Sequence, residues 1–367
     1  MKFSVNQSEL ARALAVVSKG VSTRSTLPVL AGILVEAIGD EVVFHSTDLE
    51  LAIRYRVSAL VEEEGRVVVP GKLFTDIVKG LPDAAVTVSL SDGSATVQAG
   101  SSKFSIRTLN ADDFPSFPEV SVYQTAKVPF ETFSDMVKRT ARVASRDESR
   151  AILTGVLITY ENTTLKMVAT DSYRLAVCER EVSQQAEEPF EAVVAAGFLN
   201  DLAGLERSAD DLCIALAENQ IVITYQGTTF INRRIEGNYP NYRQLIPAES
   251  NIRIEMDRTQ LHDAVKRASL LGNPTMPVLF DVNADTQTVQ LSSALQDVGS
   301  AQESVTAEIS GGDVCIAFNC SYVLDGLAAL GNDRVLLEVQ EATKPGVFRA
   351  LGDKGEFLYL VMPVRVS

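Results

Sequence analysis

Residues 197–202 are Gly197-Phe198-Leu199-Asn200-Asp201-Leu202, and a similar pattern occurs twice more in the chain. The counterparts are Lys72-Leu73-Phe74-Thr75-Asp76-Ile77 and Ser321-Tyr322-Val323-Leu324-Asp325-Gly326, so the three aspartates are 125 and 124 residues apart. The pair Thr47-Asp48 recurs with nearly the same step at Thr170-Asp171. Because a fixed period is the mark of repeated structural units, the sequence predicts three copies of a unit of about 120 residues.

Each unit is expected to begin with an amphipathic helix. Apolar residues recur at spacings of three and four over residues 8–19, 130–144 and 259–271, which places them on one face of a helix. These faces consist of Leu10, Leu14 and Val17, then Phe133, Met136, Val137, Thr140 and Val143, then Leu261, Ala264, Val265, Ala268 and Leu271. Capping pairs mark the starts of the first and third of these helices, Asn6 with Glu9 and Asp257 with Gln260.

The remainder of each unit has the pattern of strands and turns. Residues 164–169 and 220–225 are rich in β-forming side chains, and Asp92-Gly93 is typical of a two-residue hairpin turn. The connections between such segments are too short for helical crossovers, so the sheets should be mainly antiparallel. Each unit is therefore predicted to be an antiparallel sheet plus two helices, an α+β fold. We expect the units to be three domains, residues 1–124, 125–249 and 250–367.

The composition limits the possible environments. The chain has 33 Lys and Arg against 48 Asp and Glu, a formal net charge of −15. That balance argues against a protein that grips nucleic acid over its whole surface, but it allows a local basic stripe. No apolar run approaches the roughly 18 to 20 residues of a membrane span, and the N-terminal residues have no apolar signal core. We expect a cytoplasmic protein whose four cysteines are buried free thiols, namely Cys178, Cys213, Cys315 and Cys320.

The sequence contains no motif for catalysis, metal binding or cofactor binding. It has only two histidines, His45 and His262. His45-Ser46-Thr47-Asp48 contains residue types of a catalytic triad, but neighbours within one strand point to opposite faces and cannot converge. There is no phosphate-binding glycine loop, and the cysteines lack metal-ligand spacing. We therefore expect a protein that is not an enzyme and that needs no metal or cofactor.

Cations gather on the expected helices of this acidic chain. They are Arg12, Lys19, Lys72 and Lys79 in the first unit, Lys138, Arg139, Arg142, Arg146 and Arg150 in the second, and Lys266 and Arg267 in the third. From the residues alone two interpretations remain open. The cations form a face that contacts nucleic acid, or they cover the solvated side that any amphipathic helix has.

Longer motifs occur in a fixed order along the chain. They are Thr26-Leu27-Pro28-Val29-Leu30 behind Arg24, Ala169-Thr170-Asp171-Ser172-Tyr173-Arg174-Leu175-Ala176-Val177, Gly237-Asn238-Tyr239-Pro240-Asn241-Tyr242-Arg243, Phe318-Asn319-Cys320-Ser321-Tyr322-Val323-Leu324-Asp325 and Val361-Met362-Pro363-Val364-Arg365. In order and spacing this set resembles the bacterial sliding clamp, the beta subunit of DNA polymerase III, over the full length. The resemblance implies three repeats of a DNA-clamp fold in a head-to-tail homodimeric ring, whose helices face a hole that holds duplex DNA.

The resemblance also implies a function and residues for DNA contact. The protein would encircle duplex DNA without sequence preference and tether the replicative polymerase for processive synthesis, with no catalysis of its own. The DNA-binding residues would be Arg24, Lys72, Lys138, Arg139, Arg142, Arg146 and Arg150. One departure is Ala195-Ala196-Gly197, which stands where related clamps often carry basic residues and argues against DNA contact from that corner.

A pocket for partner peptides is the second site that the resemblance implies. Its matching residues are Leu153, Thr170, Ser172, Tyr173, Arg174, Leu175, Pro240, Leu245, Val361, Met362, Pro363, Val364 and Arg365. From the residues alone, Leu153, Leu175 and Val361 are better explained as core. Two departures bear on peptide preference, since Ser172-Tyr173 replaces the commoner glycine-histidine and Gln244 replaces a basic residue.

The implied partners are the catalytic subunit of the replicative polymerase, the clamp loader, and repair and translesion polymerases that carry short hydrophobic peptides. No membrane partner is expected. Three alternatives remain: a specialised duplicate clamp linked to antibiotic resistance, a hydrolase, and an acidic protein scaffold that makes no contact with DNA.

Overall fold

The computed structural model describes residues 1–22, 25–122, 124–183, 188–272, 275–295, 297–353 and 355–365. The chain forms two compact units, one from Met1–Glu131 with Gly204–Arg234 and the other from Thr132–Ala203 with Ile235–Ser367. The second sequence repeat is therefore divided between the two units.

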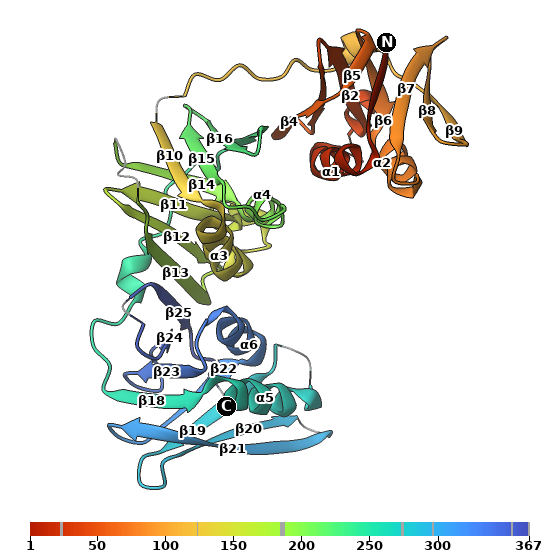
Figure 1. The fold of residues 1–367 in the computed structure, drawn as a ribbon. Helices are drawn as coiled ribbons and strands as arrows, with labels where there is room; N and C mark the ends of the chain where they lie inside the picture. Colours follow the sequence, from red (N-terminus) through yellow and green to blue (C-terminus); the bar gives the residue numbers. More distant parts are fainter. Residues whose placement is uncertain are drawn as a thin grey trace. The chain divides into compact units, whose positions relative to one another are not determined.

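The first repeat has its two expected helices and a set of antiparallel strands. Its elements are β1 (Lys2–Asn6), α1 (Gln7–Val17), β2 (Gly32–Ile38), β3 (Glu41–Thr47), β4 (Leu51–Ser58), β5 (Leu60–Glu63), β6 (Gly65–Pro70), α2 (Gly71–Gly80), β7 (Ala85–Ser91), β8 (Ser94–Ala99) and β9 (Ser102–Arg107) (Figure 1). The predicted apolar face of α1 is buried. The predicted cap is wrong, because the Asn6 side chain accepts no hydrogen bond at the helix start. The Gln7 N–H, at the first position of the helix, donates to the Ala84 carbonyl at 3.0 Å.

The second repeat follows the same order of elements. They are β10 (Gln124–Pro129), α3 (Phe130–Thr140), β11 (Gly155–Glu161), β12 (Thr164–Thr170), β13 (Arg174–Glu181), β14 (Phe190–Ala195), α4 (Ala196–Ala203), β15 (Asp211–Leu216), β16 (Gln220–Tyr225) and β17 (Thr228–Arg233). The predicted apolar face of the first helix, from Phe133 to Val143, is fully buried. The helix ends at Thr140 and continues as a 3-10 turn, so the burial extends one turn beyond it.

The third repeat completes the chain. Its elements are β18 (Ile252–Asp257), α5 (Arg258–Ala268), β19 (Pro277–Asn283), β20 (Thr288–Leu295), β21 (Gly299–Ser310), β22 (Val314–Asn319), α6 (Cys320–Ala329), β23 (Arg334–Val339), β24 (Gly346–Ala350) and β25 (Phe357–Val361). The predicted cap at Asp257 is confirmed, since its carboxylate accepts the Gln260 N–H at 2.8 Å. Leu271 is only half-buried, because a 3-10 turn over Ser269–Leu271 replaces the α-helical period there.

The paired strands confirm the predicted α+β class. Every strand pair among the described residues is antiparallel, and Asp92 and Gly93 have the positive φ values, 49° and 71°, that a tight hairpin requires. The unit that holds the first repeat contains a five-stranded sheet, β5-β1-β7-β8-β9, and an eight-stranded sheet, β10-β15-β16-β17-β4-β3-β2-β6. The other unit contains a twelve-stranded sheet, β14-β11-β12-β13-β25-β24-β23-β18-β21-β20-β19-β22. Adjacent repeats thus share a sheet, through β4 with β17 and through β13 with β25.

The cysteines only partly follow their expected burial. Cys178 and Cys320 are buried, Cys213 is half-buried and Cys315 is exposed. Cys315 alternates with the buried Ile316 along β22, so its side chain points away from the core. Burial raises the pKa of the Cys178 thiol to about 12. None of the described helices is long and apolar enough to cross a membrane.

Candidate functional site

Exposed cations follow the end of α3 and the turn after it. Lys138, Arg142 and Arg146 are all exposed, the first on the helix and the others beyond its last turn. Among the described residues, neither Lys138 nor Arg146 has an ion-pair partner. The Arg142 Nε donates to the Lys138 carbonyl at 3.0 Å. Three positive charges therefore face solvent along one edge of the second repeat, as phosphate contact requires.

Arg139 has different surroundings from its neighbours. Its side chain is 20% exposed and its Nε lies 2.9 Å from an Asp135 carboxylate oxygen. The guanidinium also lies over the ring of Phe357 in the third repeat, 5.6 Å from its centroid. These contacts give Arg139 a structural role where the second and third repeats meet. They leave little of its side chain for a nucleic acid.

The other repeats contribute fewer unpaired cations. Lys72 is exposed on α2. Arg12 lies 3.3 Å from Glu206, and Arg267 forms a two-pronged ion pair with Glu303 at 2.7 and 2.9 Å. Arg24 lies outside the described residues. Lys79 on α2 and Lys266 on α5 are exposed as well, but among the described residues only the second repeat places three exposed cations, Lys138, Arg142 and Arg146, close together along the chain.

A depression of about 500 Å³ separates two of these cations from α4. Arg142 and Arg146 line one side of it, and Ala195, Ala196 and Gly197 line the other. The departure noted in the sequence thus corresponds to an open, uncharged wall. Any anion held here would be bound from the arginine side.

The turn between β12 and β13 is tightly hydrogen-bonded. The Asp171 Oδ1 accepts the backbone N–H groups of Tyr173 and Arg174 at 2.9 and 3.0 Å. The Thr170 hydroxyl donates to the Arg174 carbonyl at 2.7 Å and accepts the Ser172 N–H at 3.1 Å. Ser172 has a φ of 80°, a conformation unusual for a residue other than glycine. The turn holds the Tyr173 side chain out in solvent, 60% exposed.

Arg150 joins this turn to the cationic loop. It lies in the 3-10 segment Glu148–Thr154, and its Nη1 donates to the Ser172 hydroxyl at 2.9 Å. One residue that the resemblance assigns to DNA therefore contacts one that it assigns to the peptide pocket. Sequence separation hid this proximity, because the two residues belong to different segments of the second repeat.

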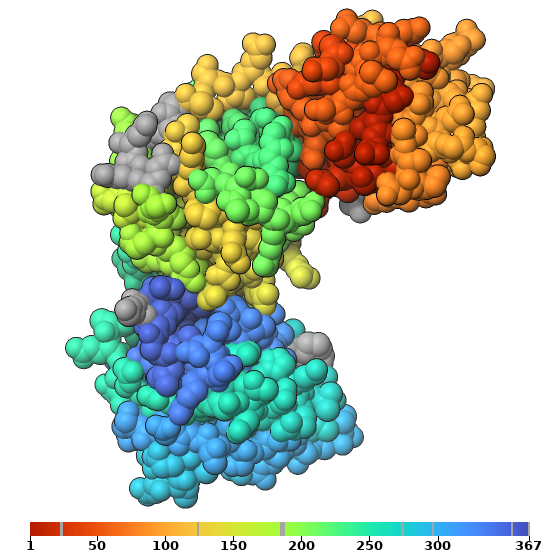
Figure 2. Space-filling model, in the orientation of Figure 1, coloured from red at the N-terminus to blue at the C-terminus, as the bar shows by residue number. Residues whose placement is uncertain are grey.

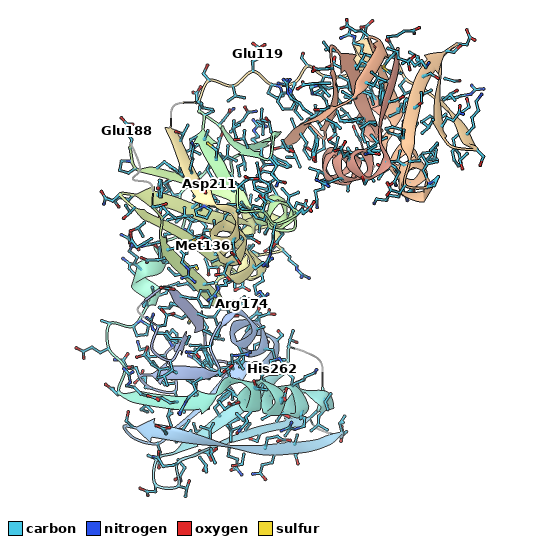
Figure 3. All side chains as sticks on the ribbon, viewed as in Figure 1. Glu119, Met136, Arg174, Glu188, Asp211 and His262 are labelled. Atoms are coloured by element: carbon cyan, nitrogen blue, oxygen red, sulfur yellow. The ribbon has the colours of Figure 1, made fainter. Side chains whose placement is uncertain are left out.

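Arg174 lies where the second repeat meets the third (Figure 3). Its Nε lies 3.0 Å from an Asp171 oxygen and its Nη1 lies 2.5 Å from Asp325 Oδ2 on α6. Its guanidinium stacks over the Tyr322 ring at 4.4 Å, and its Nη2 donates to the Arg142 carbonyl at 3.2 Å. Since the side chain is only 11% exposed, it supports the predicted pocket from below and presents little surface to a ligand.

The strand pair β13–β25 brings the turn and the end of the chain together. Arg174 is opposite Val361, Leu175 is opposite Leu360, and the Met362 N–H donates to the Tyr173 carbonyl at 2.8 Å. Figure 2 shows the dark blue end of the chain against the yellow and lime residues of the second repeat. The two motifs that the resemblance places in one pocket are therefore neighbours.

The predicted pocket residues divide by exposure. Leu153, Thr170, Leu175 and Val361 are buried, and Leu175 belongs to an apolar cluster on which Met362 packs. Met362 and Pro363 are half-buried. The exposed members are Ser172, Tyr173, Pro240, Leu245, Val364 and Arg365. In this state of the chain, Leu175 and Val361 are core, and a ligand would meet mainly the half-buried and exposed residues.

Asp325 and Tyr359 also belong to this site, although no sequence motif indicated them. Tyr359 donates its hydroxyl hydrogen to the Tyr322 carbonyl at 2.8 Å and lies 3.4 Å from Arg174. Burial raises the pKa of the Tyr359 hydroxyl. Asp325 was identified only as a marker of the repeat. The only sequence feature that pointed to Asp325 was its equivalence to Asp76 and Asp201 in the other repeats. That equivalence did not predict its ion pair with Arg174.

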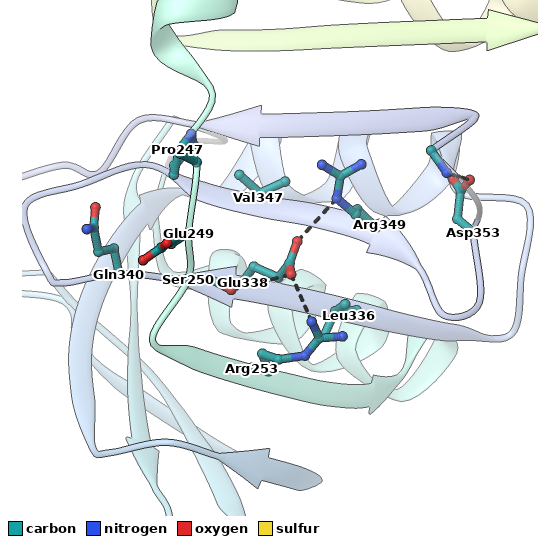
Figure 4. Close-up of a pocket in the computed structure, with 12 residues that line it drawn as sticks. Pro247, Glu249, Ser250, Arg253, Leu336, Glu338, Gln340, Val347, Arg349 and Asp353 are labelled. Carbon is teal, nitrogen blue, oxygen red and sulfur yellow. Dashed lines mark hydrogen bonds and ion pairs between the residues drawn. The ribbon is translucent and has the colours of Figure 1, made fainter.

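A larger pocket of about 540 Å³ lies elsewhere in the third repeat (Figure 4). Its central residue is Glu338, which lies 3.3 Å from Arg253 and 3.2 Å from Arg349. Glu249 and Asp353 add further charge to its wall. These charges largely balance one another, and the pocket contains none of the predicted site residues. Its apolar lining, Pro247, Ala248, Leu336 and Val347, lies among these charges, so the pocket is less suited to an apolar anchor side chain than a groove with mainly apolar walls.

His45 and Asp48 serve structural purposes. Asp48 Oδ1 accepts the backbone N–H groups of Glu50 and Leu51 at 2.9 and 2.7 Å. His45 is 6% exposed and lies 2.9 Å from a Glu36 oxygen. Burial lowers the pKa of His45 to about 4, against the opposing effect of the Glu36 charge. Across the described ranges, no group of three His, Cys, Asp or Glu side chains is arranged to hold a metal ion.

Comparison with known proteins gives the family of the chain. Models of the DNA polymerase III beta subunit match residues 1–118 with the N-terminal domain, 127–241 with the central domain and 243–365 with the C-terminal domain. The chain belongs to the DNA polymerase III beta subunit family. The predicted resemblance is thereby confirmed.

Relatives and solved structures agree over the whole length. The beta sliding clamps of a Synechocystis species and of Streptomyces coelicolor are 35% and 34% identical to this chain, with 100% of both chains covered. The DNA polymerase sliding clamp of Bacillus subtilis matches with a TM-score of 0.95 at 27% identity, again over 100% of both chains. The predicted role in processive DNA replication is supported, and the alternatives are not favoured.

Proposed function

We propose that two copies of this chain form a head-to-tail ring that encircles duplex DNA and tethers a DNA polymerase without catalysing a reaction. The observation that carries the proposal is the concentration of exposed cations, Lys138, Arg142 and Arg146, on a protein of net charge −15. A weak, local basic surface suits a protein that must stay on DNA and still slide, because each neutralised phosphate adds to binding strength. We place this activity in the cytoplasm, where the protein would meet DNA.

The pattern of strand pairing supports a head-to-tail assembly. The fourth strand of the first repeat pairs with the last strand of the second, β4 with β17, and the fourth strand of the second repeat pairs in the same way with the last strand of the third, β13 with β25. Within one chain, two strands have no partner of this kind: β21, the fourth strand of the third repeat, and β9, the last strand of the first repeat. β9 is an edge strand, and β21 pairs with β20 over Gly299–Thr306 while meeting β18 only afterwards. We propose that β21 of one copy pairs with β9 of the next, a heterologous contact that closes after two copies.

Exposed apolar side chains lie at both of these edges. Phe104 on β9 is 43% exposed, and Leu270, in the 3-10 turn after α5, is 76% exposed. Large exposed apolar residues at an unpaired strand edge favour association with another chain. The proposal assigns both to the contact between copies, in a ring made of domains 1–124, 125–249 and 250–367.

DNA contact is proposed for the cations that remain accessible. These are Lys72, Lys138, Arg142, Arg146 and Arg150. Arg24 is retained on the resemblance alone, because it lies outside the described residues. Arg139 is assigned to the junction of the repeats, since Asp135 and Phe357 occupy it.

Partner binding is proposed at the turn Thr170–Arg174 and the chain end from Met362. Met362, Pro363, Val364, Leu245, Pro240 and Tyr173 form the accessible lining, and the buried Leu153, Leu175 and Val361 form the floor beneath it. Short hydrophobic peptides of the polymerase, the clamp loader and the repair and translesion polymerases are the proposed ligands. A few anchor side chains in a groove provide most of the affinity of such complexes.

The experiment that tests this function compares circular with linear DNA. The protein is loaded on a nicked plasmid by a bacterial clamp loader with ATP, and half of the sample is then linearised with a restriction enzyme. A ring stays with the circle through gel filtration in high salt and slides off the linear DNA. Equal retention on both forms would contradict encirclement, and no retention on either would contradict the proposed DNA role.

A further inference from the structure

A cavity of about 230 Å³ lies where the first and second repeats share a sheet. Its walls are Ala15 and Val16 of α1, Tyr55 of β4, Leu205 after α4, and Tyr225 and Thr228 of the β16–β17 hairpin. All of these residues belong to one compact unit. Arg12 and Glu206, 3.3 Å apart, stand at its rim. Arg12 and Lys19, two of the cations noted on the helices, line the cavity, but none of the residues assigned to DNA contact or to the peptide pocket does.

The second junction has an equivalent place, which the strand registers identify. Leu51 is opposite Asn232 at the first junction, and Arg174 is opposite Val361 at the second. Counting along these pairs makes Thr228 equivalent to Phe357. The starts of α1 and α3, Gln7 and Phe130, likewise make Val16 equivalent to Arg139 and Arg12 equivalent to Asp135.

The equivalent place in the second junction is filled. The Phe357 ring lies under the Arg139 guanidinium, and the Asp135 carboxylate holds that guanidinium at 2.9 Å. An aromatic ring and a charge pair thus seal the second junction. At the first junction Val16 and Thr228 are too short to fill the same volume, which leaves the cavity open.

The charge at the rim is reversed between the two junctions. The second has a carboxylate, Asp135, that receives a cation, whereas the first has a guanidinium, Arg12, at the equivalent position. Tyr55 adds a polar group to the wall, and no described residue forms a hydrogen bond with its hydroxyl. Burial raises the pKa of this hydroxyl, so it remains protonated and can donate.

We propose that this cavity binds a small aromatic anion, with its ring between Val16 and Tyr55 and its anionic group on Arg12. The ring takes the place that Phe357 fills at the second junction, and the anion meets Arg12 as Asp135 meets Arg139. Glu206 shares Arg12 with the ligand or swings away, since both side chains are more than half exposed. A bound ligand would close the first junction as the second is closed by its own side chains.

The affinity expected for a ligand of about ten heavy atoms is modest, with a Kd on the order of 1 mM. The probe is phenylacetate, tested with the full chain and without DNA by ligand-observed NMR titration. Phenylacetamide, which lacks the charge, and acetate, which lacks the ring, are the matched controls. Since no DNA and no partner protein is present, the result is independent of the proposed ring.

Variants of the chain locate the site. Val16→Phe and Ala15→Phe each place a ring in the cavity and should abolish phenylacetate binding. Ala15 is at an exposed position of α1, so its substitution should disturb the fold less. Arg12→Gln should weaken it about fivefold, as loss of a partly exposed ion pair does, without changing phenylacetamide binding. Arg56→Gln, an arginine on the same strand as Tyr55 that pairs with Glu41, should leave binding unchanged. Circular dichroism checks that each variant is folded.

Three results would overturn the inference. One is the absence of saturable phenylacetate binding to the parent chain at millimolar concentration. Another is unchanged affinity in a folded cavity-filling variant. The third is equal affinity for phenylacetate and phenylacetamide, which would remove the role of the anion and of Arg12.

Discussion

The Arg174 guanidinium and the Asp325 carboxylate are 2.5 Å apart, although 151 residues separate them in the chain. They join the β12–β13 turn of the second repeat to α6 of the third. The same guanidinium contacts Asp171 and Tyr322, so the shape of the proposed peptide groove depends on one side chain. A residue assigned to ligand contact by resemblance therefore holds two repeats together.

Replacing Arg174 with alanine should destabilise the unit that contains it by about 2 kcal/mol, because a largely buried charge network loses its centre. Asp325 is 42% exposed, which keeps the loss below that of a fully buried pair. Urea unfolding followed by circular dichroism measures the change. Arg142→Ala, at an exposed arginine next to this network, should change stability by no more than about 0.5 kcal/mol. Equal effects of the two substitutions would contradict the structural role of Arg174.

Neutralising the exposed row with Lys138→Gln, Arg142→Gln and Arg146→Gln should weaken DNA binding. Removing one cation that neutralises a phosphate should reduce the slope of log affinity against log salt by about 0.9. Fluorescence anisotropy with a duplex at several salt concentrations measures the slope. Arg253→Gln removes one strand cation that pairs with Glu338 and is the matched control. The triple variant should lower the slope by more than three times the change in the control. If the slope falls by the same amount per substituted residue in both proteins, these three cations are not the DNA contacts.

Assembly should fail when either proposed edge is charged. Leu270→Asp and Phe104→Asp should each weaken the dimer at least thirtyfold, about 2 kcal/mol, because an exposed apolar contact becomes a buried charge. Sedimentation velocity measures the dimer population.

Mixing these two variants is the more decisive experiment. A head-to-tail contact leaves one intact edge on each variant, so the mixture should form open dimers that do not stay on circular DNA. Dimers in either single variant, or closed rings from the mixture, would contradict the proposed interface.

Met362→Ala should lower the affinity for a short hydrophobic partner peptide by about tenfold to thirtyfold, since the side chain forms part of the accessible wall. This substitution is preferable to deleting the chain end, because the backbone N–H groups of Met362 and Val364 donate to Tyr173 and Ala317. Isothermal titration calorimetry gives the affinity. The control is the same peptide with its anchor residues replaced by alanine, which should bind neither protein. If the variant binds the peptide as tightly as the parent chain, the peptide-binding groove lies elsewhere on the protein.

Stability should decrease as the pH falls from about 6.5 to about 4, because His45 stays neutral in the fold over that range. The folded-state pKa is depressed from the ordinary value of 6.5, so the unfolded chain binds the proton first and is favoured by acid. The full decrease from this one residue is about 3 kcal/mol. Denaturant unfolding across this pH range should show that His45→Gln removes most of the slope. His262→Gln, at the other histidine, should retain it, and the reverse outcome would exclude His45 as the cause.

Local patterns were sufficient for the elements of this fold. The faces of α1 and α3 follow from a spacing of three and four, because 3.6 residues per turn bring those side chains to one side. Asp92-Gly93 predicts its hairpin because positive φ values are needed at both positions. The cap at Asp257 formed as predicted. The cap at Asn6 did not form, since its side chain accepts no hydrogen bond from the first turn of α1.

The candidate sites depended on contacts that no local pattern contains. The sequence determined that cations lie on the helices and that the motifs of a clamp occur in order. Only the tertiary structure decided that Arg139 faces Phe357 while Lys138 faces solvent, and that Leu175 is buried beneath Met362. It also decided that Arg150 reaches Ser172 and that one repeat junction is filled while the other is open. Burial and charge pairing depend on which strands meet, and the strands that meet at these junctions come from different repeats.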